Sequence, residues 1–247
     1  MTGQAALQGH WHREWIRAPG FEDYTTQVHW LQAGDLFADL RIPAERPDVR
    51  GLSALAELPA FDLSRLLEAE GFAGHTTVQD GRCTWHRHIN WHGVPPQADI
   101  GQMWWDVDGA LIEDGVLSEY RELWRRQEMP APQVHPVRAG AQTGLLIDSG
   151  SLFVLAIGPV PSGDTTAFRA ALAAGERNDA ALHAQFESEY LLGHWDGRFG
   201  IAALSTNPLH EGHVALERGD GFTWHALAFD GRETARPLDP VQVPVDA

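Results

Sequence analysis

The sequence predicts a mainly β fold, an antiparallel β-barrel architecture of one large or two small barrels with short helical insertions. Short strand-like runs alternate with turn signals along the chain. Charged and aromatic residues recur at period two, as Trp85 and Arg87 do, so they share one face of a strand. A face that mixes Trp with Arg and Glu is neither a dry core nor a solvated surface. It is typical of a barrel interior lined by a polar network.

Strands are expected first in a half that covers residues 28–129 and follows an N-terminal segment, 1–27. They are predicted at 28–32, 36–43, 75–78, 82–91, 101–107, 110–114 and 119–127. Asp108 and Gly109 form one of the stronger hairpin signals. Leucines at helical spacing predict two short helices in an insertion over 52–70, with Asp62 or Ser64 as N-cap and Gly71 as the stop.

The second half, 130–236, also consists of hairpins and a helical insertion, but its strand and turn signals are weaker. Pro130, Pro132 and Pro136 mark the passage into it. A helical insertion is expected over 165–184, interrupted near Gly175. The strand pairs are predicted at 142–147 with 151–157, 186–195 with 198–205, and 212–217 with 222–229. The Pro-rich tail, 237–247, is expected to be a surface extension.

Composition bounds the size and class of the protein. The 247 residues, 43% of them hydrophobic, suffice for one large β-domain or two small ones. Ten Trp predict that most indoles are buried or line a pocket. With Asp+Glu 34 and Lys+Arg 18, the net charge of −16 repels phosphate backbones and anionic lipids. We therefore expect neither nucleic acid nor membrane as a partner.

Cysteine usage and the absence of targeting patterns indicate the compartment. Cys83 is the single cysteine, which excludes an intrachain disulfide and fits a reducing environment. The first residues lack a basic region followed by an apolar run, and no stretch approaches ~20 uninterrupted apolar residues. We expect a cytoplasmic protein in which Cys83 is a buried, inert thiol.

Short segments throughout the chain carry a family resemblance. They are 30–32, 37–43, 72–74, 83–87, 99–103, 113–124, 187–189, 205–208 and 211–212. Together they resemble a widespread set of poorly characterised calycin-like, lipocalin-related β-barrel proteins, similar to a fungal casein-kinase-interacting barrel protein. The resemblance covers about residues 28–215 and implies a lipocalin-related barrel with a pocket for a small organic ligand. It implies no particular reaction, because calycin barrels host transport, haem binding, cyclisation and decarboxylation.

The interior candidates define the predicted binding site. A guanidinium inside a barrel stays charged and needs carboxylate or hydrogen-bond partners. If one is left partly unsatisfied, it becomes an anchor for a carboxylate, phenolate or enolate of a ligand. Tryptophans would form apolar walls, with Tyr and Gln supplying hydrogen bonds. The predicted ligand-binding residues are Trp30, Gln32, Asp39, Arg41, Trp85, Arg87, Glu113, Tyr120, Glu122 and Trp124.

Three functions remain compatible with this interior. The first is a binding protein that holds a small, largely apolar ligand with an anionic or carbonyl group. The second is a barrel enzyme, an isomerase, cyclase or decarboxylase, with an Arg or Tyr electrophile and Glu as acid or base. The third is an interaction module without an open cavity whose partner is a protein. A closed ion network that only fixes strand register is the structural alternative.

Other chemistry is not expected. His86 and His88, with Asn90 and His92 continuing their face, could present imidazoles to a metal. Period two places these histidines opposite Trp85, however, so they should point outward, and no third ligand is recognisable nearby. No Cys-x-x-Cys-His, dinucleotide-binding or phosphate-loop motif occurs, so we predict no cofactor. Glu187 and Glu189, which could act as paired carboxylates, are read as a solvated strand face.

Overall fold

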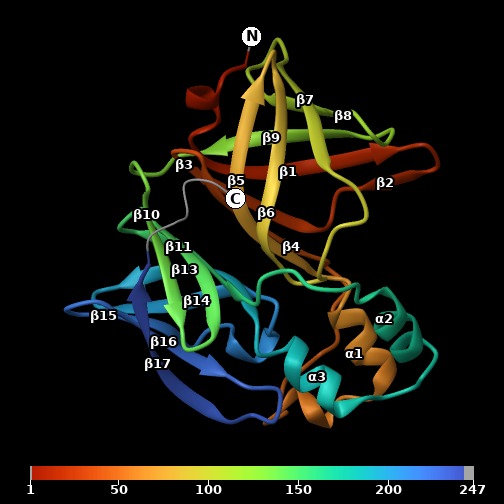
Figure 1. Cartoon of the computed structure of the whole chain (residues 1–247), viewed down its shortest axis with the longest axis vertical. Coiled ribbons are helices and arrows are strands. Elements are labelled where there is room, and N and C mark those ends of the chain that lie inside the picture. The colour runs from red at the N-terminus through yellow and green to blue at the C-terminus, as the bar shows by residue number, and fades with distance from the viewer. Residues whose placement is uncertain (1, 242–247) are drawn as a thin grey trace.

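The computed structural model describes residues 2–241 and contains two closed antiparallel barrels of eight strands each. The prediction of a mainly β antiparallel barrel fold is confirmed, and the chain forms two barrels rather than one. In Figure 1 the first barrel, coloured red to yellow-green, lies above the second, coloured green to blue. No helix in the described part of the chain is long and apolar enough to cross a membrane.

The first barrel is closed by pairing between its first and last strands. Gly34, Gly81 and Gly109 have positive φ in its turns, which glycine adopts without steric cost. The strands are β1 (Gly9–Ala18), β2 (Phe21–Asp23), β3 (Gln27–Ala33), β4 (Leu36–Ile42), β5 (Glu70–Gln79), β6 (Arg82–Asn90), β7 (Asp99–Trp105), β8 (Leu111–Gly115) and β9 (Arg121–Gln127). Strand β2 extends the sheet beside β1, outside the closed ring.

Strand β1 places part of the N-terminal segment inside the first barrel, which begins at Gly9 rather than at residue 28. It pairs with β3 on one side and with β9 on the other. A β-bulge between Arg13 and Trp15 interrupts its side-chain alternation. Because a bulge shifts the period-two pattern by one residue, the strand is not visible as a simple alternation in the sequence.

The second barrel is closed by β17, which pairs with β16 and with β10. Its strands are β10 (Gln133–Ala139), β11 (Gln142–Asp148), β12 (Leu152–Gly158), β13 (Glu189–Asp196), β14 (Phe199–Ser205), β15 (Val214–Arg218), β16 (Phe222–Leu227) and β17 (Glu233–Pro240). Residues 237–240, expected in a surface tail, therefore belong to the barrel. The contact with β10 is short, Val137 with Pro240 and Arg138 with Asp239, so prolines remove few ladder hydrogen bonds. Residues 242–247 lie outside the described residues.

Helices occupy both predicted insertions. These helices are η2 (Leu55–Glu57) and α1 (Ala60–Leu66) in the first insertion, and α2 (Thr166–Ala173) and α3 (Asp179–Gln185) in the second. Two further short helices, η1 (Gln4–Leu7) and η3 (Pro208–His210), lie outside the insertions. The N-cap of α1 is Pro59, not Asp62 or Ser64, and α1 ends before Gly71. Gly71 lies in β5, where a Cβ would collide with the Tyr190 ring. Close packing between the barrels, not helix termination, therefore requires this glycine.

One hydrophobic core lies at the junction of the two barrels and contains residues of both. Outward-facing residues of the first barrel, such as Leu40 and Ile89, pack with Ile147, Val154 and Tyr190 of the second. Helices α1, α2 and α3 gather to one side of the second barrel (Figure 1), and their residues Leu63, Leu172 and Leu182 join this core. Burial of this shared surface fixes how the barrels lie against each other.

Candidate functional site

The predicted aromatic residues converge in the interior of the first barrel, where they form a packed core. The Trp30 ring meets Trp85 and Trp124 edge to face, at centroid distances of 5.6 and 5.7 Å. Trp30 Nε1 donates to Gln32 Oε1 at 3.1 Å, and Gln32 Nε2 donates to Thr76 Oγ1 at 2.8 Å. The polar groups of Trp30 and Gln32 are therefore satisfied by the protein itself.

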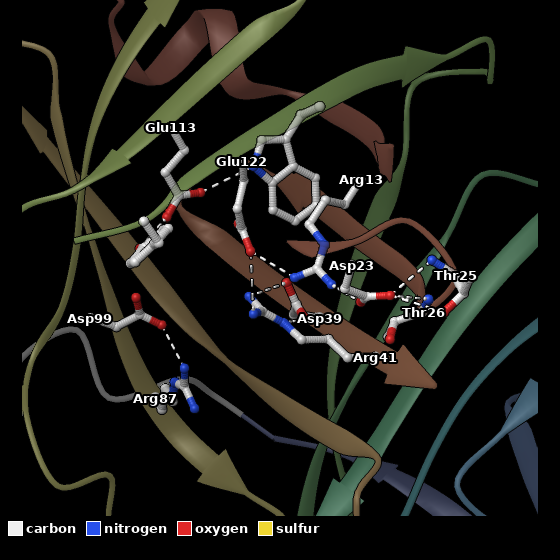
Figure 2. A network of polar contacts seen from close by, with 12 residues as sticks. Arg13, Asp23, Thr25, Thr26, Asp39, Arg41, Arg87, Asp99, Glu113 and Glu122 are labelled. Atoms are coloured by element: carbon white, nitrogen blue, oxygen red, sulfur yellow. Dashed lines mark hydrogen bonds and ion pairs between the residues drawn. The ribbon is translucent and has the colours of Figure 1, made fainter. Parts of the chain in front are cut away.

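A buried ion network joins three predicted residues to two unpredicted ones, Arg13 and Asp23 (Figure 2). Arg41 Nε donates to Asp39 Oδ1 at 2.8 Å, and its Nη1 lies 3.8 Å from Glu122 Oε1. Arg13 donates to the same Glu122 oxygen at 2.7 Å and to Asp23 at 3.1 Å. Arg13 was missed because its strand was not recognised. These paired charges fit the structural role of a closed network.

Glu113 lies directly across from Glu122 on the neighbouring strand. Burial and the nearby Glu122 and Asp99 carboxylates raise the pKa of Glu113 well above its ordinary value, which favours its protonated form. Tyr120 Oη donates to one of its oxygens at 2.7 Å and Trp124 Nε1 to the other at 3.1 Å. Both oxygens are held by protein groups, which does not favour acid–base catalysis.

Arg87 differs from the other interior arginines because its guanidinium is only partly satisfied. Nη2 donates to Asp99 Oδ2 at 2.5 Å, and the guanidinium carbon lies 3.5 Å from the Phe72 ring centroid. Nε is buried and has no hydrogen-bond partner within residues 2–241. The side chain keeps 14% of its surface exposed. A charged group with an unused donor is a binding-site candidate, because burying that donor unpaired costs free energy.

A β-bulge places Arg87 at the edge of a cleft. Arg87 pairs with Gly74 and Ile89 with Ala73, so His88 is the extra residue. A Cβ on Gly74 would collide with the His86 carbonyl oxygen, so this position requires glycine. Because of the bulge, Arg87, His88 and Ile89 all line the same cleft, although consecutive residues of a regular strand face opposite sides.

The bulge also corrects one sequence prediction. Asn90 was expected to share the outward face of His86 and His88. Instead it is buried, and its side chain donates to the Gly93 carbonyl at 2.6 Å. The predicted orientations of Trp85, Glu122 and Trp124, which are buried, and of His86, which is exposed, agree with the structure.

The cleft has a volume of about 610 Å³ and lies between the two barrels. Its basic residues are Arg87, His88 and Arg138, and no Asp or Glu within residues 2–241 lines it. One wall is tied across the barrels, because Val94 N–H donates to the Gly163 carbonyl at 2.9 Å. The apolar side chains of the lining include Leu36, Ile89, Val94, Val137, Leu145 and Val160.

Three histidines form a cluster beside the cleft. His75 Nδ1 and His88 Nε2 lie 2.8 Å apart, and the His75 ring stacks on His86 with centroids 4.4 Å apart. Burial and neighbouring imidazoles lower the pKa of all three. Among the described residues, no group of three or more His, Cys, Asp or Glu side chains is arranged to hold a metal ion.

The second barrel contains a polar cluster that sequence reasoning missed. Glu189 is buried, not solvated, and accepts hydrogen bonds from Ser205 Oγ at 2.8 Å and Trp224 Nε1 at 3.1 Å. His210 Nδ1 lies 2.7 Å from its Oε1. Burial by itself lowers the pKa of His210, but the Glu189 carboxylate raises it overall. Glu187 precedes β13, so the alternation used to pair it with Glu189 does not apply there.

An open groove of about 800 Å³ adjoins this cluster, lined by His210, His213, His225 and Glu233 among other residues. Its ionisable side chains are of both signs. The inter-barrel cleft is therefore the cavity with the clearer charge preference. Cys83 is buried and free, and burial raises the pKa of its thiol, as expected of an inert cysteine.

Comparisons with known proteins bear on the fold. No protein-family model and no curated protein sequence matches this chain. The crystal structure of the uncharacterised protein YLR301w from Saccharomyces cerevisiae is similar, with a TM-score of 0.55 and 13% sequence identity over 96% of this chain and 98% of that one. At this identity, the likeness concerns the arrangement of the backbone alone.

Proposed function

We propose that this protein binds a small, largely apolar ligand bearing one anionic group in the cleft between its barrels, with Arg87 as the counter-ion. The main evidence for this proposal is the charge of the residues that line the cleft. The chain has a net charge of −16, yet the ionisable lining residues within 2–241 are Arg87, His88 and Arg138. The volume of about 610 Å³ falls within the roughly 300–1,000 Å³ of small-molecule sites.

The state of Arg87 supports an anion rather than a neutral polar group. Its buried Nε–H lacks a partner among the described residues, while Asp99 occupies Nη2. A carboxylate, phenolate or enolate could accept the unused donors in charge-assisted hydrogen bonds. The apolar walls would then cover the body of the ligand, which gives the affinity of hydrophobic burial.

Of the ten predicted ligand-binding residues, the proposal retains Arg87 as a ligand contact. It assigns the other nine to the packed core and the ion network. We infer a cytoplasmic ligand-binding protein that is related to the calycins. Its barrel architecture supports that relation, and the satisfied oxygens of Glu113 favour binding over catalysis.

Replacing Arg87 with Met tests the counter-ion. The change keeps an unbranched apolar side chain and removes the donors, so an anion should lose about 1.5–3 kcal/mol, or about ten- to a hundredfold in affinity. Octanesulfonate and uncharged octanamide form a matched probe pair for calorimetric titration. We expect Arg87→Met to weaken octanesulfonate binding and to leave octanamide binding nearly unchanged.

Controls separate binding from folding. Arg87→Met leaves Asp99 without its partner, so the double variant with Asp99→Asn removes the stranded charge. Arg198→Met deletes an exposed arginine of the second barrel and should change neither binding nor stability appreciably. Wild-type octanesulfonate affinity in the double variant, together with a lower melting temperature of Arg87→Met, would show that Arg87 is only structural.

A further inference from the structure

His88 is the residue of the cleft lining whose charge can change near neutral pH. It is the extra residue of the bulge, next to Arg87, and it lines the cleft. Its Nε2 lies 2.8 Å from His75 Nδ1. That hydrogen bond needs one ring to donate and the other to accept, so it persists only while at least one of the two imidazoles is neutral.

The surroundings of His88 hold this pair largely uncharged at neutral pH. Burial and the His86 imidazole lower the pKa of His88, while Asp35 opposes that shift. On its partner, burial and His88 lower the pKa of His75. Besides these groups, Arg87 lies beside His88 on its own strand, and Arg138 is the basic residue on the β10 side of the cleft. Burial, the His86 imidazole and the two arginine charges therefore disfavour a proton on His88, whereas Asp35 favours one.

An anion in the cleft would reverse that balance. Its charge would add to that of Asp35 and favour the imidazolium form of His88, as an opposite charge within a few ångströms does. Thermodynamic linkage then requires that a proton on His88 strengthen anion binding to the same extent. The bulge is the structural reason that this residue can act on the cleft at all, because a regular strand would turn His88 away from the side lined by Arg87.

We propose that His88 is a second recognition residue of the cleft and that it makes the retention of an anionic ligand pH-dependent, with tight binding in acidic solution and release as the pH rises. This inference rests on the proposed function, because it needs an anion in the cleft. The single charge gained corresponds to about a five- to tenfold change in affinity in a partly hydrated site.

Octanesulfonate is the probe, because its own charge does not change between about pH 5 and pH 8, where histidine titrates. Calorimetric titrations at both ends of this range should show about five- to tenfold tighter binding to the wild type at the acidic end. His88→Gln keeps a polar side chain without the charge, so its affinity should be nearly independent of pH. His194→Gln, at an exposed position of the second barrel outside the cleft lining, is the matched control and should keep the wild-type dependence.

Two further readouts are independent of the folding of His88→Gln. Titration of the wild type in two buffers of different ionisation enthalpy should show net proton uptake on binding, of less than one proton per site. His86→Gln removes the imidazole that lowers the pKa of His88, so the affinity should begin to rise at a higher pH than in the wild type.

The outcomes distinguish the two proposals. Binding that depends on Arg87 but has the same pH dependence in wild type and His88→Gln, with no proton uptake, would overturn the role of His88 and leave the proposed function standing. No saturable octanesulfonate binding at either pH would overturn the proposed function and this inference with it. Melting temperatures of each variant at both pH values show that the protein is folded in the titrations.

Discussion

At the scale of single residues, the first barrel neutralises its buried acids in two different ways. Glu122 is paired with Arg13 and Arg41, whereas burial and nearby carboxylates raise the pKa of Glu113, directly across from it, and favour its protonated form. Two ionised carboxylates opposite each other would repel strongly in this buried site. Protonation of Glu113 therefore lets the hydrogen bonds from Tyr120 and Trp124 form without a second negative charge.

This difference predicts how stability depends on pH. Because the native pKa of Glu113 is raised, the native state retains a proton there to a higher pH than the unfolded chain does. In the unfolded chain a glutamate titrates near about pH 4.3. The stability that this proton contributes is fully present below the pKa of the unfolded chain. It is lost as the pH rises towards the raised pKa of the native state. Glu113→Gln imitates the protonated form. Its free energy of urea unfolding, minus that of the wild type, should therefore increase with pH between about pH 5 and pH 8.

The exposed Glu187 offers the control, since Glu187→Gln should give a nearly constant difference across the same range. If the free energies of unfolding of Glu113→Gln and the wild type change with pH in parallel, Glu113 is ionised in the native protein.

Residue patterns predicted the interior of the first barrel because one strand face is a local property. Period two was sufficient to group Asp39 with Arg41 and Trp85 with Arg87. The same reasoning failed at Arg13, where a bulge breaks the alternation, and at Glu189, where the assumed strand began too early. The cleft could not be predicted, because its walls come from β6 and from β10 and no local pattern encodes the distance between two barrels.

At the scale of elements, turns were the most predictable features and barrel closure the least. The Asp108-Gly109 hairpin and the helix break near Gly175 follow from residues that adopt positive φ. Strands β1 and β17 close the two barrels, but one contains a bulge and the other two prolines. Each is held in place by tertiary pairing that overrides weak local preference.

The bulge of β6 yields an element-scale prediction. Gly74→Ala would place a methyl group against the His86 carbonyl oxygen, a backbone atom with little freedom to move. We expect a loss of about 1–3 kcal/mol in stability, as for other overpacked sites. Octanesulfonate affinity should also fall, since Arg87 and His88 would shift.

Gly219→Ala is the matched control, because a Cβ at Gly219 would meet nothing within 4 Å. Thermal melts and calorimetric titration of both variants give the comparison. A Gly74→Ala protein that melts and binds like Gly219→Ala would show that the bulge is not needed for the cleft.

At the scale of the whole molecule, the shared core makes the two barrels one structural unit. Ile147 and Val154 of the second barrel pack with Leu40 and Ile89 of the first, and Tyr190 fills the space that Gly71 leaves. The cleft is part of the same junction, so its width depends on this packing. A ligand that contacts both barrels would therefore stabilise the whole chain rather than one barrel.

Cooperative unfolding across the junction follows from this argument. Leu155→Ala leaves a cavity in the second barrel's own core, outside the shared one, and should cost about 2–5 kcal/mol. If the barrels unfold together, hydrogen exchange of the slowest amides of β3 and β13 should accelerate by the same free energy. Ile147→Ala, in the shared core, should do the same. Faster exchange confined to β13 in Leu155→Ala would instead mean that the barrels unfold independently and that a ligand in the cleft bridges two separate units.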